Sequence, residues 1–169
     1  MDSFQKEQKQ FRCDFSHTNK LFYSGDNYSS MTNQLDVFNQ NGTSYILSAY
    51  SSKNTLAAYK PVNLKECITL IKQVVYVLGN IHKMGYLYLD IKPDNVLIVD
   101  GYQKQVQLFD FNSLFEWKKV NQPSDIRLSY TKGFAPIELQ TSKIKRLGPH
   151  TDVYSVGALL FYLLFGHIP

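Results

Sequence analysis

The sequence predicts an α+β fold, and three observations support this. Two pairs of strand-like segments each surround a turn sequence that ends in glycine, at 41–42 and at 100–101. Two helical patterns are also present, one amphipathic over 63–85 and one apolar over 153–165. The composition of the 169 residues, 44% hydrophobic and 19% charged, is typical of a globular protein. One folded domain with mixed secondary structure is therefore expected.

The first 50 residues predict a helix, a loop and a β-hairpin in that order. Residues 4–13 can form a helix, whereas 16–34 are rich in Ser, Asn, Thr and Gly and predict a loop with a short strand at 21–23. Strands are predicted at 35–38 and 45–50, on either side of an Asn-Gly pair. Asn-Gly is the strongest short-range hairpin signal, because both residues tolerate positive φ angles.

A long amphipathic helix is predicted to begin after Asn63. Asn63 and Glu66 form a capping-box-like start, and Gly85 is a residue that commonly ends a helix. The apolar residues between them recur with the period of one helix face. They are Cys67, Leu70, Ile71, Val74, Val75, Leu78 and Ile81. This face is expected to pack against the core.

A second hairpin is predicted by the apolar runs 96–99 and 106–109, which flank a polar turn with an Asp-Gly pair. The hairpin would fold Asn95 and Asp110 back toward each other, although 15 positions separate them. Asp90 lies in the loop just before this hairpin. Three polar residues are thus expected at one end of the hairpin.

The run from 153 to 165 predicts a helix that is apolar on all sides. Its 13 residues are too few to cross a bilayer, which needs about 20. We therefore expect a buried core helix and no membrane span.

Charge and cysteine content limit the classes of partner. The net charge of +4 is mild, and the basic residues are scattered apart from two clusters, Lys118-Lys119 and Lys143, Lys145 and Arg146. Such clusters are usually solvated faces, so nucleic-acid binding is not predicted. Cys13 and Cys67 form no Cys-x-x-Cys pair, which favours reduced thiols and a cytoplasmic location. Neither feature indicates an oligomeric state.

Residues 88–95, with the sequence YLDIKPDN, contain a set of side chains suited to phosphoryl transfer. Asp90 can accept the proton of an attacking hydroxyl, Lys92 can reach a moving phosphate, and Asn95 can hold a metal ion. Taken alone, such a segment is also a common turn sequence. Three further motifs follow it in order, Asp-Phe-Asn at 110–112, Ala-Pro-Ile-Glu at 135–138, and Thr-Asp-Val-Tyr at 151–154.

This series resembles the central part of the eukaryotic-type protein kinase domain, of the serine/threonine-like branch. The resemblance implies a truncated kinase-like fold, with a remnant of the small β-rich lobe and the hinge over 1–50 and an incomplete, mostly helical large lobe over 51–169. No Gly-x-Gly-x-x-Gly sequence occurs, and no strand with the family's lysine precedes Glu7. The chain is therefore expected to be one partial kinase domain.

The resemblance also implies roles for individual residues. Asp90 and Lys92 would be catalytic, and Asn95 and Asp110 would bind Mg²⁺ together with the phosphates of ATP. Leu97 would lie under the adenine ring.

The hinge would be formed by Ala49 and Tyr50, whose backbone groups would read the edge of the adenine, and Ser48 would gate the back of that pocket. Glu7 would be the helix glutamate that pairs with the strand lysine. Because the chain lacks that strand, Glu7 can equally be a solvated helix residue.

Further residues would support this site in the family arrangement. Tyr88 takes the place of the histidine that usually starts the catalytic loop, and it would pack with Phe11 and Phe111, although both can be plain core aromatics. Asp152 would accept backbone N–H bonds from the catalytic loop, or act as a simple helix N-cap. Thr131 is placed to contact Asp90 and Lys92.

Three departures from the family pattern bear on mechanism. Leu89 stands where many kinases have arginine, so we predict that regulation does not depend on a phosphate bound beside Asp90. Asn112 replaces glycine, which is a mild change. Ile137 interrupts the Ala-Pro-Glu triplet, and Glu138 would lack its usual arginine partner.

The first hypothesis is a domain whose parent protein transfers phosphate from Mg·ATP to serine or threonine hydroxyls of a protein substrate. The alternative is a pseudokinase or kinase-fold interaction module without catalysis, which the missing glycine-rich loop favours. A third hypothesis, a kinase-fold enzyme that acts on a small molecule, is disfavoured by the Ala-Pro-Ile-Glu region at 135–138, which shapes a peptide-binding ledge in the family.

Overall fold

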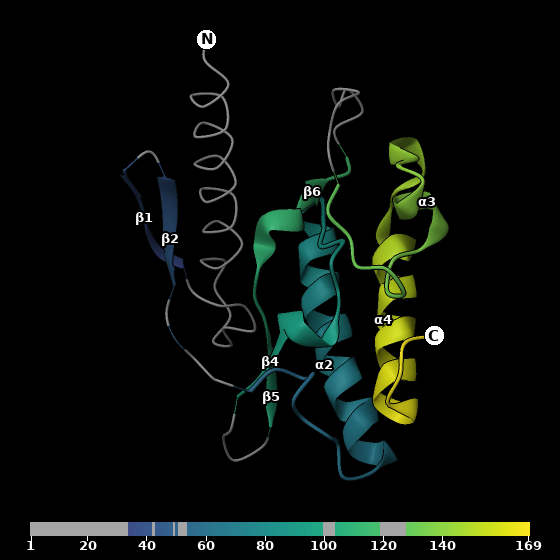
Figure 1. The fold of residues 1–169 in the computed structure, drawn as a ribbon. Coiled ribbons are helices and arrows are strands. Elements are labelled where there is room, and N and C mark those ends of the chain that lie inside the picture. The colour runs from purple at the N-terminus through teal and green to yellow at the C-terminus, as the bar shows by residue number, and fades with distance from the viewer. Residues whose placement is uncertain (1–33, 42, 49, 51–53, 100–103, 119–127) are drawn as a thin grey trace. The chain divides into compact units, whose positions relative to one another are not determined.

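The structure is a computed structural model that describes residues 34–41, 43–48, 50, 54–99, 104–118 and 128–169. Strands and helices are both present, as the α+β prediction requires (Figure 1). The chain divides into two compact units, Met1–Ser51 and Ser52–Pro169. The interpretation of these units as two lobes stays a prediction.

The first unit contains the predicted hairpin. Strand β1 (Gln34–Gln40) pairs antiparallel with β2 (Thr43–Ser48), and Asn41 has a φ angle of 51° at the turn. Phe38 and Tyr45 are cross-strand partners, and their rings stack with centroids 5.3 Å apart. The hairpin is thus confirmed. The helix predicted at 4–13 and the strand predicted at 21–23 lie outside the described residues.

Helix α2 (Leu64–Lys83) begins and ends close to the predicted residues. The Asn63 side chain accepts a hydrogen bond from the Glu66 backbone N–H at 2.9 Å. The Glu66 carboxylate does not return to Asn63 as in a full capping box; it accepts from the Val62 N–H at 2.6 Å. Gly85 follows the C-terminal cap with a φ angle of 90°, which a glycine adopts without strain.

The buried face of α2 differs from the predicted stripe at three positions. Val77 is buried, Val75 is about half exposed, and Ile71 is only partly buried. The other buried positions include Leu70 and Val74, and a helix turns by about 100° per residue. Val75 therefore points well away from the centre of this face, whereas Val77 lies one turn after Val74 on the same side. The predicted stripe was wrong for Val75 because an apolar residue can also lie on the exposed side of a helix.

The second hairpin consists of β4 (Val96–Val99) and β5 (Gln105–Leu108), with Val96 opposite Leu108. Strand β5 begins and ends one residue earlier than predicted. The next residue, Phe109, leaves the strand and donates its N–H to the Asn95 carbonyl at 3.2 Å. This bond closes the open end of the hairpin, and it places Asn95 beside the residue that precedes Asp110.

Further short elements complete the second unit. Strand β3 pairs antiparallel with β6, an interaction that no sequence pattern predicted. The elements and their bounds are β3 (Tyr86–Leu87), η1 (Pro93–Asn95), η2 (Phe111–Ser113), β6 (Phe115–Glu116), α3 (Ile137–Gln140), η3 (Ile144–Arg146) and α4 (Pro149–Phe165).

Helix α4 packs beside α2 and contacts β3 (Figure 1). It begins four residues before Val153, with Pro149 at its first position and the Gly148 N–H donating to the Thr151 hydroxyl. The prediction of burial on all sides is wrong for the described residues, because Val153 is 63% exposed and Phe165 is 62% exposed. The buried residues of α4 are Thr151, Asp152, Ser155, Val156, Ala158 and Leu159. Among the described residues, no helix combines the length and apolar character needed to cross a membrane.

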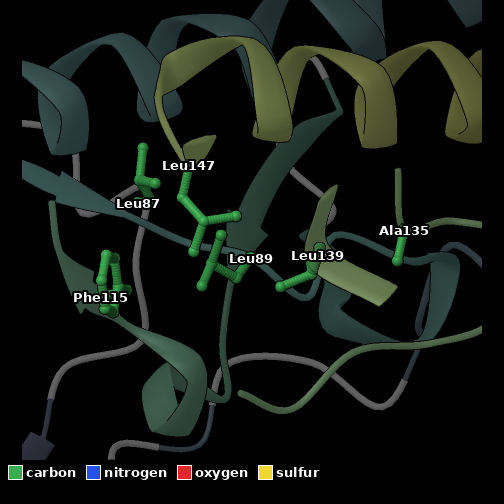
Figure 2. Packing of buried hydrophobic residues seen from close by; sticks show 6 residues of the cluster. All are labelled: Leu87, Leu89, Phe115, Ala135, Leu139 and Leu147. Carbon is green, nitrogen blue, oxygen red and sulfur yellow. The ribbon is translucent and has the colours of Figure 1, made fainter. Parts of the chain in front are cut away.

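A hydrophobic cluster joins three parts of the second unit that lie far apart in the sequence. Figure 2 shows Leu147 pointing toward Leu89, with Leu139 beside them. The six buried members are Leu87, Leu89, Phe115, Ala135, Leu139 and Leu147. Trp117, Leu128 and Ile144 pack against them. The cluster fixes the segment before Asp90 against β6 and the 128–147 region.

Candidate active site

Asp90 lies between β3 and η1, is only 6% exposed, and is surrounded by donors. Its Oδ2 pairs with Lys92 Nζ at 2.8 Å and accepts from Asn95 Nδ2 at 3.0 Å. Its Oδ1 accepts from the Thr131 hydroxyl at 2.7 Å. Lys92 Nζ also donates to the Thr131 hydroxyl oxygen at 3.1 Å, so three side chains form a closed ring. The predicted contact of Thr131 with Asp90 and Lys92 is confirmed.

The amide nitrogen of Asn95 donates hydrogen bonds to Asp90, and the amide oxygen does not take part in them. Nδ2 donates to the Asp90 carbonyl at 2.9 Å as well as to the Asp90 carboxylate. Because one end of the amide is held in this way, Oδ1 is the atom that remains for a ligand. Asn95 is 4% exposed, so its orientation is fixed by its surroundings.

Asp110 presents a carboxylate at the surface of the second unit. Its φ angle of 59° lies in the left-handed region, which aspartate tolerates better than most residues. The only hydrogen bond given to its carboxylate within the described residues comes from the Asn112 N–H at 3.4 Å, which is long. The carboxylate is therefore exposed and only weakly hydrogen-bonded, so its oxygens are accessible to a ligand.

The side chains of Asn95 and Asp110 fit a hard cation. Mg²⁺ prefers oxygen ligands and usually combines one or two protein oxygens with waters and substrate phosphates. An amide oxygen and a carboxylate are ligands of this kind, and the Phe109 to Asn95 backbone bond brings the backbone of Asn95 beside the residue that precedes Asp110. Across the described residues, no group of three or more His, Cys, Asp or Glu side chains could hold a metal by itself.

Tyr88 contacts both neighbours of Asp110. It is fully buried, its hydroxyl donates to the Phe109 carbonyl, and its ring meets the Phe111 ring edge-on at 5.6 Å between centroids. Burial raises the pKa of Tyr88 well above its ordinary value, and the nearby carboxylate of Asp110 adds to this. The hydroxyl therefore stays protonated and keeps its donor role. The predicted contact of Tyr88 with Phe111 is confirmed, and Phe11 lies outside the described residues.

Asp152 anchors the segment before Asp90. Its Oδ2 accepts from the Tyr88 N–H at 2.9 Å, and its Oδ1 accepts from the Leu89 N–H at 2.8 Å. Leu89 has a φ angle of 66°, which is strained for a residue with a side chain and costs about 1–2 kcal/mol. The N-cap of α4 is Gly148, so the alternative of a simple helix cap is wrong for Asp152.

His82 is a supporting residue that the sequence reasoning missed. Its Nε2 lies 2.7 Å from Asp152 Oδ2, and its side chain is 15% exposed. His82 sits in the last turn of α2, 70 positions before Asp152. A polar residue on the otherwise apolar face of α2 was the available signal, but it does not identify the partner.

Leu89 lies in an apolar environment. Its neighbours in the hydrophobic cluster include Phe115 and Leu139, and none of the cluster's side chains is charged (Figure 2). Glu138 lies near two side chains of the described region, His150 Nε2 at 3.6 Å and the Thr151 hydroxyl at 3.5 Å. Glu138, which was expected to lack its usual arginine partner, thus has contacts with these two side chains.

The residues expected around a nucleotide base are only partly described. Leu97 is buried in β4, where its neighbour Ile98 donates its N–H to the Asn54 carbonyl at 2.8 Å. Tyr50 is 73% exposed in the first unit. Ser48 ends β2, and its side chain lies outside the description. Ala49 and Glu7 also lie outside the described residues.

Comparison with known protein families identifies the family of this chain. The sequence matches the family model described as "Protein kinase domain" over residues 17–169. The chain belongs to the protein kinase family. This kinase domain is mixed α+β and contains the Asp90 ring and the hairpin described above.

Individual relatives are distant serine/threonine kinases. The chain is 27% identical over 141 residues to "Probable serine/threonine-protein kinase KCC4" of Saccharomyces cerevisiae, which covers 79% of this chain and 13% of the relative. It is 32% identical over 106 residues to human "Serine/threonine-protein kinase MRCK beta", covering 59% of this chain and 6% of the relative. It is 26% identical over 166 residues to the Saccharomyces cerevisiae "Aurora kinase", covering 96% of this chain and 42% of the relative. The kinase chain thus spans less than half the length of these relatives.

Proposed function

We propose that this kinase domain transfers the γ-phosphoryl group of Mg·ATP to a serine or threonine hydroxyl of a protein. The arrangement around Asp90 carries the proposal. A carboxylate has about four acceptor positions, and Lys92, Asn95 and Thr131 occupy three of those on Asp90. The position that remains is on Oδ1. A substrate hydroxyl that donates to this atom would be held in one orientation.

Asp90 then acts as the proton acceptor. As the substrate oxygen bonds to the transferred phosphoryl group and the bond to ADP breaks, the hydroxyl proton passes to Asp90 Oδ1. A positioned base of this kind contributes about 10²–10⁴-fold to a rate. Thr131 holds Oδ1 from the other side, so the carboxylate cannot rotate away from the hydroxyl.

Lys92 has two functions in this proposal. Its ammonium group holds Asp90 Oδ2 in the resting site and, with its side chain 23% exposed, it can also reach a phosphate oxygen. Bound Mg²⁺ would supply charge neutralisation of the phosphates. Asn95 Oδ1 and the Asp110 carboxylate are the atoms of this chain that would hold it. Tyr88 positions Asp110 through its contacts on both sides of that residue.

The remaining binding residues and the location are also proposals. Leu97 would form the floor of the base pocket, Ala49 and Tyr50 would form the hinge, and Ser48 would gate the pocket. Glu7 would be the family's helix glutamate, whose usual lysine partner does not precede it in this sequence, or else a solvated helix residue. Support for these roles comes from their order relative to the family motifs. The lack of a Cys-x-x-Cys pair in the sequence supports reduced thiols and hence a cytoplasmic location, which cell fractionation would test.

Transfer of radioactive phosphate from ATP to a mixed serine and threonine peptide library tests the catalytic proposal. Asp90→Asn should lower the transfer rate by at least about 100-fold, because the proton acceptor is lost. Asp94→Asn is the matched control, since Asp94 is an exposed carboxylate in the same loop, and it should change the rate less than about twofold. Equal rates in the two variants would contradict the role of Asp90.

The alternative is a kinase-fold interaction module without catalysis. The absence of any Gly-x-Gly-x-x-Gly sequence in these 169 residues favours it, because that loop covers the phosphates in active kinases. Calorimetry with millimolar Mg·ATP separates the two proposals. Absence of nucleotide binding would favour the interaction module.

A further inference from the structure

Residues 128–150, which we call the basic segment, carry most of the net charge of the chain. The segment contains four cations and one carboxylate, a net charge of +3 compared with +4 for all 169 residues. The four cations are Lys132, Lys143, Lys145 and Arg146. All four are exposed, and none is in an ion pair with another described residue. Their charges therefore face solvent.

The one carboxylate of the basic segment, that of Glu138, is mostly buried. The Glu138 side chain is 16% exposed and lies 3.6 Å from His150 Nε2. It also accepts from the Thr151 hydroxyl at 3.5 Å. A ligand that approaches the segment thus meets cations, and the carboxylate does not offset them.

The basic segment is connected directly to the Asp90 site. Lys132 follows Thr131, whose hydroxyl lies 2.7 Å from Asp90 Oδ1. The cations of η3 are tied to the same region through α3, because Gln140 Nε2 donates to the Ala135 carbonyl at 2.6 Å and the Lys143 N–H donates to the Glu138 carbonyl at 2.9 Å. A peptide that places a hydroxyl at Asp90 therefore lies near Lys132, and the segment continues from there through α3 to the cations of η3.

We propose that the protein substrates of this kinase carry acidic residues next to the phosphorylated hydroxyl. The inference rests on the proposed function and adds a substrate class to it. Asp90 and Asp110 would repel acidic residues, so the cations of the basic segment are what make an acidic substrate favourable. Opposite charges at the rim of an interface raise the association rate and select partners.

The test compares three serine peptides, flanked by Asp and Glu, by Ala, or by Lys. Each exposed ion pair is worth about 0.2–1 kcal/mol, so two or three pairs predict a kcat/KM for the acidic peptide about tenfold above that for the Ala peptide. Lys132→Glu replaces an attraction by a repulsion and should lower the ratio of acidic to neutral kcat/KM by about fivefold or more. Lys72→Glu, an equal charge change at an exposed position of α2, should leave that ratio unchanged.

Salt provides an independent readout. The screening length falls from about 10 Å at 0.1 M to about 3 Å at 1 M ionic strength, so the preference for the acidic peptide should shrink toward unity at high salt. A preference that is equal at both salt concentrations would mean that charge does not set it, which would overturn the proposal.

Binding of fluorescent versions of the same peptides separates failure of the substrate class from failure of catalysis. If no peptide is phosphorylated, the catalytic proposal fails, and anisotropy still shows whether the acidic peptide binds more tightly than the neutral and basic ones. Equal binding, or a preference for the basic peptide, would overturn the inference. Displacement of the acidic peptide by a single-stranded oligonucleotide of equal charge would also overturn it, since the surface would then recognise any polyanion.

Discussion

The hydrogen bonds that Asp152 makes to the segment before Asp90 give the sharpest stability prediction. In Asp152→Asn the side chain keeps one acceptor oxygen, and its NH₂ group faces either the Tyr88 or the Leu89 N–H. One charge-assisted hydrogen bond is lost, which costs about 1.5–3 kcal/mol, and a buried N–H is left without a partner, which costs about 1–3 kcal/mol. Relief of the Leu89 backbone strain returns about 1–2 kcal/mol if the segment relaxes.

These terms give an expected loss in the free energy of unfolding of about 0.5–5 kcal/mol, with a midpoint of about 3 kcal/mol. That midpoint is a large part of the roughly 5–15 kcal/mol typical of a domain. Urea denaturation followed by circular dichroism measures it. Ser155→Ala is the matched control, because Ser155 is buried on the same helix and its hydroxyl bond to the Thr151 carbonyl is 3.4 Å long. This control should lose less than about 1 kcal/mol. Equal losses in the two variants would refute the anchoring role of Asp152.

Three further predictions follow from other contacts. Tyr88→Phe should lower the free energy of unfolding by about 1–3 kcal/mol in urea denaturation, since the Phe109 carbonyl loses its buried donor; a loss below about 0.5 kcal/mol would argue against it. Hydrogen bonds from Tyr59 and the Val62 N–H lower the pKa of Glu66, so Glu66 stabilises the fold above its ordinary pKa and this contribution disappears as pH falls through the lowered value. The stability difference between wild type and Glu66→Gln should accordingly be larger at pH 7 than at pH 3, and the opposite trend would show that the sign is wrong. Because Leu89 lies in an apolar cluster, phosphorylation within 113–131 should raise activity less than tenfold in a kinase assay, and a greater rise would contradict this.

Local signals predicted the elements that position the site. The Asn-Gly turn predicted the hairpin of β1 and β2, and Asn63 predicted the start of α2. The hairpin of β4 and β5 followed from two apolar runs, and its closure through Phe109 follows from its register. Each of these features depends on residues that are close in the sequence, which is why the sequence was sufficient.

Features that depend on distant residues could not be predicted in the same way. The pairing of β3 with β6 joins two-residue strands that carry no periodic pattern of their own. The contact of His82 with Asp152 spans 70 positions, and histidine at the end of a helix has many possible partners. The exposure of Val153 depends on which side of α4 meets α2, and a uniformly apolar helix does not encode that choice.

The most direct test of the proposed metal-assisted site is a calorimetric titration of the full chain with ATP, with and without Mg²⁺. If Asn95 and Asp110 hold the metal, Mg²⁺ should strengthen ATP binding at least about tenfold in the wild type. Asp110→Asn should remove most of this gain, and its affinity for metal-free ATP should stay within about twofold of the wild type. Binding of ATP that does not respond to Mg²⁺, or an Asp110→Asn variant that responds as the wild type does, would contradict the proposed site.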